Sequence, residues 1–352
     1  MGVDLRHGGN RDAVASRLNC APSQLLDASA SLVPWSPRFP RIGLSAWRDY
    51  PDRSQALLRE LIGVLHHVDP SFVLPGNGAA ELFTWAARDA VEQGSSVLTA
   101  PGFADYGRAL RCWSGGYRQQ QLPLLWEEGF PQPFPDAGEG SVMWICNPHN
   151  PTGQLWSRAS LQPLLERYKL VICDEAFLPL VPSGEQQSLI PLVAEHSNLV
   201  VIRSLTKLFG IAGLRLGYAI AEPQRLERWS QWRDPWPVNG LAAAAGERLM
   251  ADASWSQKVQ AWVAKERPWL ADQLVRRGWQ VSPSSCNFLL VQRGHQLESW
   301  RQQLEQQHRI LVRDCRSFTG LDESWWRLAL LDRRRNRRLL RALDQVQATD
   351  RA

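Results

Sequence analysis

The sequence predicts an α/β protein: a large domain with a mainly parallel central sheet flanked by helices, followed by a small C-terminal α+β domain. Three observations indicate this fold class. Short runs rich in β-branched residues recur between positions 96 and 221, they are apolar at consecutive positions, and helical patterns separate them. Strands that are buried on both faces and joined by helices are typical of a parallel sheet covered on both sides.

The elements follow one another in a clear order. Turn residues dominate to about residue 45, and two helical patterns separated by FVLPGNG (72–78) occupy residues 55 to 95. The predicted strands of the large domain are SVLTAP (96–101), SVMWIC (141–146), KLVICDEAF (169–177), NLVVIRS (198–204) and LRLGYAIA (214–221). We therefore expect an N-terminal arm over 1–45, a large domain over 46–235, and linking helices with the small domain over 236–352.

Three strand-like runs are expected in the small domain, NFLLVQR (287–293), RILVRD (309–314) and WWRLALL (325–331). The basic stretch DRRRNRRLLRALDQVQ (332–347) then carries leucines at helical spacing, so its arginines are interpreted as the solvated face of a final helix. No nucleic-acid-binding module accompanies this stretch, so no nucleic-acid partner is expected although the net charge is +5.

Composition excludes several other classes of protein. The chain has 352 residues, of which 44% are hydrophobic and 21% charged, so it can bury a core. It has no apolar run of about 18 residues, so no membrane span is predicted, and its first residues lack the apolar segment of a secretory signal. Its six cysteines are scattered, which indicates reduced thiols in a cytoplasmic protein rather than a disulfide framework or a metal site.

Polar residues stand where the predicted strands end. Asn150 follows SVMWIC, Asp174 ends KLVICD, and Lys207 follows NLVVIRS, with Arg215 further along. Ligands of parallel sheets bind outside the carboxyl ends of the strands. In addition, GNG (76–78) leads directly into a helix, whose first amides suit a phosphate. A primary amine, a carboxylate and a phosphate cradle together favour pyridoxal 5'-phosphate (PLP) as the cofactor.

The motifs that carry this constellation resemble those of PLP-dependent enzymes of fold type I, in the branch of the histidinol-phosphate aminotransferases. They are PGNGAAE (75–81), PGFADYGRA (101–109), NPHNPTG (147–153), DEAF (174–177) and SLTKLFGIAGLRLGY (204–218). The resemblance implies that Lys207 forms the Schiff base with PLP, that Asp174 pairs with the pyridinium nitrogen, and that Asn150 bonds the phenolic oxygen. It further implies that Phe103 stacks on the cofactor ring. The implied site for the cofactor phosphate is formed by Gly78, Ala79, Ala80, Ser204, Thr206 and Arg215.

Within this branch, HGGN (7–10), RDYPD (48–52), DPWPVNGLAAAAGE (234–247) and RILVRDCRSFTGLD (309–322) resemble the threonine-phosphate decarboxylase family. That resemblance implies decarboxylation of L-threonine O-3-phosphate to (R)-1-amino-2-propanol O-2-phosphate for cobalamin biosynthesis. It assigns the substrate phosphate to His7, Arg313 and the partner subunit's Tyr50, and the carboxylate to Arg327, with Asn150 also next to the substrate. The chain departs from the family at Ser31, where an asparagine is usual, and at Leu331, where a second arginine is usual.

Two alternatives remain open at this stage. A histidinol-phosphate-type aminotransferase would use the same cofactor residues. A non-catalytic sensor that controls transcription would carry an appended DNA-binding segment, which the early position of HGGN leaves no room for. A homodimer is expected, because the sites of fold type I enzymes usually form at a subunit interface.

Overall fold

The computed structural model describes residues 8–38, 41–124, 126, 129–136, 138–252, 254–294 and 297–349. Within these ranges, seven strands form the large sheet in the order β2-β8-β7-β6-β5-β3-β4. Their bounds are β2 Val73–Asn77, β3 Ser96–Ala100, β4 Tyr117–Gln121, β5 Val142–Cys146, β6 Leu170–Asp174, β7 Leu199–Ser204 and β8 Leu216–Ala221. Neighbours from β4 to β7 pair in parallel, whereas β8 is antiparallel to both β7 and β2. The predicted mainly parallel sheet is therefore confirmed.

Two apolar layers cover this sheet. One joins side chains of α4 (Gly78–Gln93), α5 (Ala104–Cys112) and α9 (Pro223–Trp232) to one set of strand residues. The other joins α3 (Ala56–His66), α10 (Gly240–Met250) and the first half of α11 (Ser254–Val275) to the alternate strand residues. Because successive strand residues point to opposite faces, strands apolar at every position are buried on both sides.

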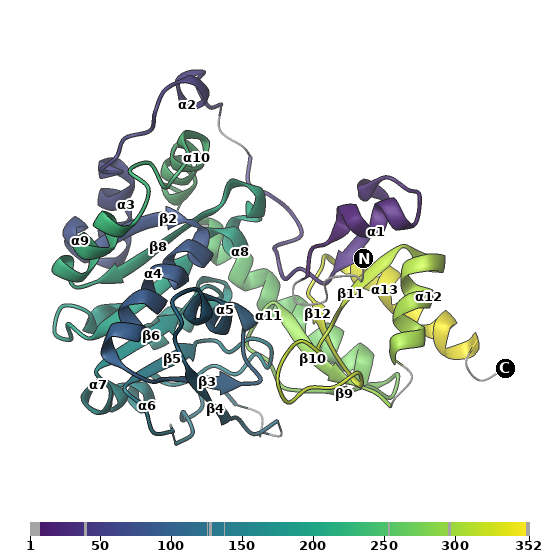
Figure 1. Ribbon diagram of the computed structural model, residues 1–352. Helices are drawn as coiled ribbons and strands as arrows, with labels where there is room; N and C mark the ends of the chain where they lie inside the picture. The colour runs from purple at the N-terminus through teal and green to yellow at the C-terminus, as the bar shows by residue number, and fades with distance from the viewer. Residues whose placement is uncertain are drawn as a thin grey trace.

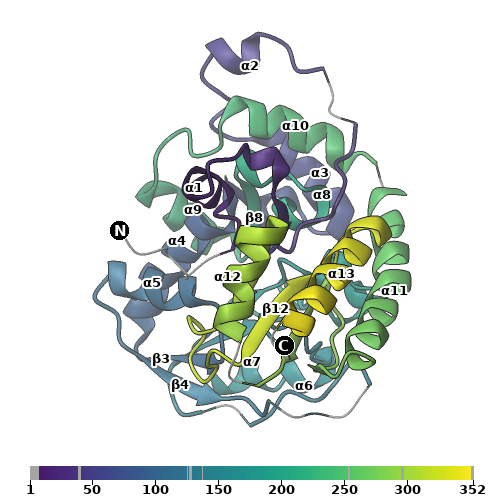
Figure 2. The ribbon, with the colours of Figure 1, turned by 90° about the vertical axis from the view of Figure 1, so that its right-hand side faces the viewer.

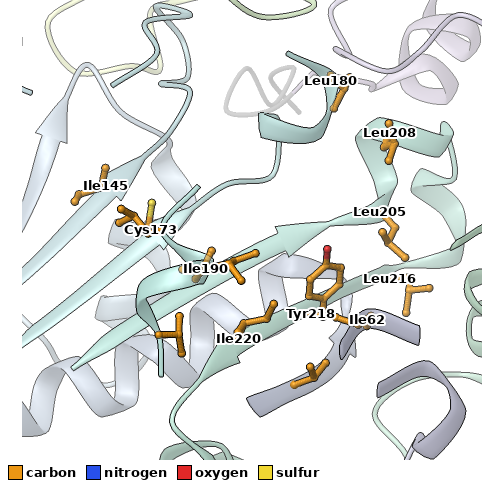
Figure 3. Packing of buried hydrophobic residues seen from close by; sticks show 14 of the residues in the cluster. Ile62, Ile145, Cys173, Leu180, Ile190, Leu205, Leu208, Leu216, Tyr218 and Ile220 are labelled. Carbon is orange, nitrogen blue, oxygen red and sulfur yellow. The ribbon is translucent and has the colours of Figure 1, made fainter. Parts of the chain in front are cut away.

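Figure 3 shows part of the second layer. Ile145, Cys173 and Ile220 extend from the strands, and Ile62 of α3 and Ile190 of a connecting turn approach them. Cys173 is fully buried in this layer, as are the two isoleucines of the strands. This packing fixes the position of the strands, and with them the polar residues at their carboxyl ends.

The small domain lies beside the large one and is built from both ends of the chain (Figure 1). In the described part of the chain its sheet has the order β1-β11-β12-β10-β9. The strands are β1 Leu26–Ala28, β9 Gln280–Val281, β10 Phe288–Gln292, β11 Ile310–Asp314 and β12 Trp325–Ala329. The N-terminal arm thus contributes β1, which pairs in parallel with β11. The two domain boundaries drawn from the sequence stay predictions.

The remaining helices complete the two domains. They are α1 Arg11–Arg17, α2 Ser45–Arg48, α6 Arg158–Leu161, α7 Leu164–Arg167, α8 Leu205–Phe209, α12 Leu297–His308 and α13 Arg333–Thr349. The expected basic final helix is α13, which buries Leu339, Leu340 and Leu343 and leaves most of its arginines exposed. None of the helices in the described ranges is long and apolar enough to cross a bilayer.

A buried ion pair joins β6 to β7 where both strands end. The Arg203 guanidinium lies 2.7 Å from a Glu175 carboxylate oxygen, and both side chains are inaccessible to solvent. Ser188 Oγ and the Leu189 amide donate to the same carboxylate, and Arg203 also pairs with Glu185 at 2.8 Å. Since the neighbouring residues in sequence are Asp174 and Ser204, this network fixes the strand ends that carry the predicted site.

Candidate active site

Twelve of the predicted site residues line one cavity of about 200 Å³ between the two domains. They are Ser31, Ala79, Ala80, Phe103, Asn150, Asp174, Ser204, Thr206, Lys207, Arg215, Arg313 and Arg327. The cavity lies at the carboxyl ends of β5, β6 and β7, as the parallel sheet requires. Residues separated by about 300 positions in the sequence therefore meet at one place.

Asp174 is the buried carboxylate of this cavity. Tyr106 Oη donates to its Oδ2 at 2.5 Å, and the Ala176 amide donates to its Oδ1 at 2.9 Å. Burial raises the pKa of Asp174 to about 6, against the opposing effects of these two hydrogen bonds and of the Lys207 charge. Among the described lining residues it is the only carboxylate, so it is the natural partner for a cation such as a pyridinium nitrogen.

Lys207 lies in the short helix α8, directly after β7. Burial lowers the pKa of its amine to about 8, and the charges of Arg327 and Arg215 act in the same direction, while Asp174 opposes them. Its Nζ lies 5.5 Å from the centre of the Phe177 ring. An amine with this pKa is partly unprotonated near neutral pH and can act as a nucleophile.

A phosphate cradle lies at the start of α4. Gly78 has a φ of +73°, and a Cβ there would stand 2.5 Å from Arg215 Nη2, so the guanidinium lies against the helix N-terminus. The hydroxyls of Ser204 and Thr206 also line the cavity, and neither has a hydrogen-bond partner among the described residues. Helix amides, free hydroxyls and a guanidinium form a donor set that suits a phosphate.

Asn150 and Arg327 are directly connected. Arg327 Nη1 donates to Asn150 Oδ1 at 2.6 Å, and Nη2 donates to the Ser29 carbonyl at 3.1 Å. This contact occupies Oδ1 of Asn150, so the group of Asn150 that can bind a ligand is its amide nitrogen, as a donor. Arg327 Nε and Ser31 Oγ are buried without partners in the described structure, and burial lowers the pKa of Arg327 to about 10. A buried cation with a free donor suits an anionic ligand.

One predicted substrate residue, Tyr50, is not brought into the cavity of this chain. Tyr50 is 79% exposed near α2 and stacks on Trp236 at 4.3 Å. Because the prediction has the partner subunit's Tyr50 reaching the site, exposure here neither confirms nor contradicts it. His7 lies outside the described residues.

Several residues that line the cavity were not predicted from the sequence, among them Phe318 and Ser29, and neither was a supporting residue, Tyr106. Phe318 lines the cavity beside Arg313, and Ser29 supplies the carbonyl that holds Arg327. Tyr106, which bonds Asp174, comes three residues after Phe103 inside the motif PGFADYGRA. That spacing places Phe103 at the N-cap and Tyr106 in the first turn of the same helix, α5, a signal that could have found Tyr106.

Comparison with known proteins decides the family. The model of the family described as aminotransferase class I and II matches residues 39–343. The chain belongs to this family. The predictions of a fold type I architecture and of a PLP-dependent enzyme are thereby confirmed at the level of the family.

The similar proteins include both threonine-phosphate decarboxylases and histidinol-phosphate aminotransferases. A threonine-phosphate decarboxylase of Salmonella typhimurium is 34% identical, over 97% of this chain and 96% of its own. A histidinol-phosphate aminotransferase of Anaeromyxobacter is also 34% identical, but over 69% of this chain and 68% of its own. The structure of the histidinol-phosphate aminotransferase of Sinorhizobium meliloti in complex with pyridoxal-5'-phosphate has a TM-score of 0.80 at 19% identity, covering 99% of this chain and 98% of that one.

The residues present fit PLP. Asp174 would face the ring nitrogen, Lys207 would bond the aldehyde, and the cradle at Gly78 and Arg215 would hold the phosphate. When bound, PLP supplies an electron sink for the substrate's α-carbon. Around the described cavity no group of three or more His, Cys, Asp or Glu side chains offers a metal site.

Uptake of PLP by the apoprotein should depend on pH through Lys207. We expect the uptake rate to rise with pH and to reach half its maximum near pH 8, because the unprotonated amine is the nucleophile. Arg327→Gln removes a nearby positive charge, so it should raise the pKa of Lys207 and move the midpoint to higher pH. Stopped-flow absorbance measures both; the exposed Arg316→Gln serves as the control. A pH-independent rate would contradict this role of Lys207.

Proposed function

We propose that this protein is a PLP-dependent decarboxylase that converts L-threonine O-3-phosphate to (R)-1-amino-2-propanol O-2-phosphate for cobalamin biosynthesis. The observation that carries the proposal is the pair Arg313 and Arg327. They face each other in register on the adjacent strands β11 and β12, and both line the cavity. With Arg215 assigned to the cofactor phosphate, two guanidinium groups remain for the substrate.

Such a pair suits a compact substrate with two anionic groups. In threonine phosphate the carboxylate and the phosphate are only a few bonds apart, on adjacent carbons. Arg327, held by Asn150 and the Ser29 carbonyl, would bind the carboxylate. Arg313, whose Nη2 donates to Ser317 Oγ at 2.6 Å, would bind the phosphate. The similarity to the Salmonella decarboxylase over nearly the whole chain supports the same substrate.

The contacts of Arg327 with the carboxylate and of Arg313 with the phosphate would influence whether decarboxylation or transamination takes place. Which bond at the substrate's α-carbon breaks depends on how that carbon is oriented against the cofactor, and two fixed anions define one orientation. Lys207, with a pKa near 8, can then return a proton to the α-carbon. The aromatic wall formed by the buried Phe177 and Phe318 and the partly buried Phe103 would limit the access of water to this step.

The approach to the cavity is also cationic. A groove of about 950 Å³ shares Gly8, Ala30 and Lys207 with the cavity, so the two are adjacent. Its outer wall carries Arg334, Arg335, Arg338 and Arg341 of α13. These arginines, which are exposed on α13, therefore lie beside the cavity, and their field would favour the arrival of an anionic substrate.

The second candidate is a histidinol-phosphate-type aminotransferase. The similarity to the Anaeromyxobacter enzyme favours it, and the two arginines would also suit the two carboxylates of glutamate as amino donor. Histidinol phosphate itself has a phosphate but no carboxylate, so it would leave Arg327 buried without an anion. The decarboxylase uses both arginines in a single substrate, which is why we rank it first.

The test incubates the PLP-loaded protein with L-threonine O-3-phosphate and measures carbon dioxide and aminopropanol phosphate. We expect both products in equal amounts. Arg313→Gln should lower kcat/KM for threonine phosphate about 10- to 100-fold, the value of a charge-assisted hydrogen bond, with little effect on unphosphorylated threonine. Arg316→Gln is again the matched control. No carbon dioxide, together with turnover of histidinol phosphate and 2-oxoglutarate, would reverse the ranking of the two functions.

We further propose that the protein is a homodimer that uses the outer end of the large domain. Helix α2 stands at the edge of the molecule in both views (Figures 1 and 2). Exposed apolar side chains lie on or next to α2, namely Leu44, Trp47 and Tyr50, and others lie on α3, namely Leu57, Val64 and Leu65. Apolar groups of this extent on a folded surface typically mark an interface, and this one contains Tyr50.

Trp47→Glu should convert the dimer to a monomer that still takes up PLP but has a higher KM for threonine phosphate, because the partner subunit's Tyr50 is lost. Light scattering coupled to gel filtration measures the mass. Val275→Glu, an exposed apolar position at the end of α11, is the control and should leave the mass unchanged. A Trp47→Glu monomer with unaltered KM would refute the role of Tyr50, and an unaltered dimer would refute the interface.

A further inference from the structure

We propose that Tyr106 is a positioning residue of the cofactor site, which holds the Asp174 carboxylate in its ionised form and in a single orientation. This inference depends on PLP binding and not on the identity of the substrate. Its failure and the failure of the proposed function are therefore separate outcomes.

The contact itself is specific. Tyr106 is buried, with 2% of its surface exposed, and its hydroxyl donates to Asp174 Oδ2. The Ala176 amide donates to Oδ1. Each oxygen of the carboxylate thus has one donor, and the phenol is the only side-chain hydrogen-bond donor to it in the described part of the chain. A phenol from α5 therefore sets the position of a carboxylate at the end of β6.

The ring of Tyr106 is held so that its hydroxyl cannot turn away. It packs edge-on against Phe83 at 5.1 Å and against Phe103 at 5.5 Å, and it lies over Trp144 at 5.4 Å. Phe103 is the residue predicted to stack on the cofactor ring. One side chain therefore contacts both the group that would face the ring nitrogen and the group that would face the plane of the ring.

The charges around Asp174 explain why this donor matters. Lys207 approaches from α8, the buried thiol of Cys146 lies on β5, and Glu175 points to the other face of the sheet, where it pairs with Arg203. Burial raises the pKa of Asp174, whereas the Tyr106 hydrogen bond lowers it. Without the hydroxyl, more of the carboxyl group would be protonated near neutral pH, and a neutral carboxyl group cannot stabilise a pyridinium cation.

A buried tyrosine with only a packing role is the competing explanation. Burial by itself requires a partner for the hydroxyl, and Tyr168 shows what such a case looks like. Its hydroxyl donates to the Gly138 carbonyl, a neutral group away from the cavity. Tyr106 instead donates to the one carboxylate among the described lining residues, so its removal should affect the cofactor and not only the fold.

The experiment compares the holoenzymes of Tyr106→Phe, Tyr168→Phe and wild type. The dissociation constant for PLP is measured from the bound chromophore in dilution series at pH 7 and pH 9. We expect Tyr106→Phe to raise it about tenfold at pH 7, the value of one hydrogen bond to a charged group, and clearly less at pH 9, where Asp174 ionises without help. Tyr168→Phe should match wild type at both pH values.

A double variant tests whether Tyr106 affects PLP affinity through the Asp174 carboxylate. In an Asp174→Asn background, Tyr106→Phe should have little further effect on PLP affinity, because the carboxylate through which it acts is gone. The proposal is overturned if Tyr106→Phe binds PLP as tightly as wild type at pH 7, if its loss is the same at pH 7 and pH 9, or if the loss persists in the Asp174→Asn background.

Discussion

One buried carboxylate among cations governs the structure of this site. Asp174 stands at the end of β6 with Lys207, Arg215, Arg313 and Arg327 around the same cavity. Its burial is unfavourable for the charged form, as its raised pKa shows. The surplus of positive charge on the lysine and the three arginines is also unfavourable until anionic ligands bind. The arrangement makes physical sense only for a site whose ligands bring a ring cation for the carboxylate and anionic groups for the arginines and the cradle.

The fold supplies the rigidity that such a site needs. Asp174 and Glu175 are neighbours in the chain and point to opposite faces of the sheet. Glu175 closes the ion pair with Arg203 beneath the strand ends, while Asp174 faces the cavity. The small domain brings Arg313 and Arg327 from paired strands, so the cofactor residues come from one domain and the two arginines proposed for the substrate from the other. Relative motion of the domains would then change substrate contacts without disturbing the cradle.

Much of this was predictable from sequence because the informative signals are local. The strands β3, β5, β6, β7 and β8 are continuous apolar runs, and the residues at their ends belong to short motifs. Two edge strands of the large sheet were missed for physical reasons. β4, YRQQQ, is polar because it lies at the edge of the sheet, and β2 contains Pro75, which an edge position tolerates. The pairs Tyr106–Asp174 and Arg203–Glu175 join residues 68 and 28 positions apart, and only the folded chain brings them together.

The role of the buried Asp174 carboxylate can be measured through the thermal stability of Asp174→Asn and wild type, with and without saturating PLP. The folded pKa of Asp174, about 6, lies above its ordinary value of 3.8, so its burial costs stability above pH 6 and this cost disappears as the pH falls toward 4. Without PLP the variant should be the more stable protein at pH 8, by up to about 3 kcal/mol, and should lose this advantage near pH 4. With PLP at pH 8 wild type should gain more stability than the variant. A variant that is less stable than wild type at pH 8 without PLP, or that gains as much from PLP, would contradict the account.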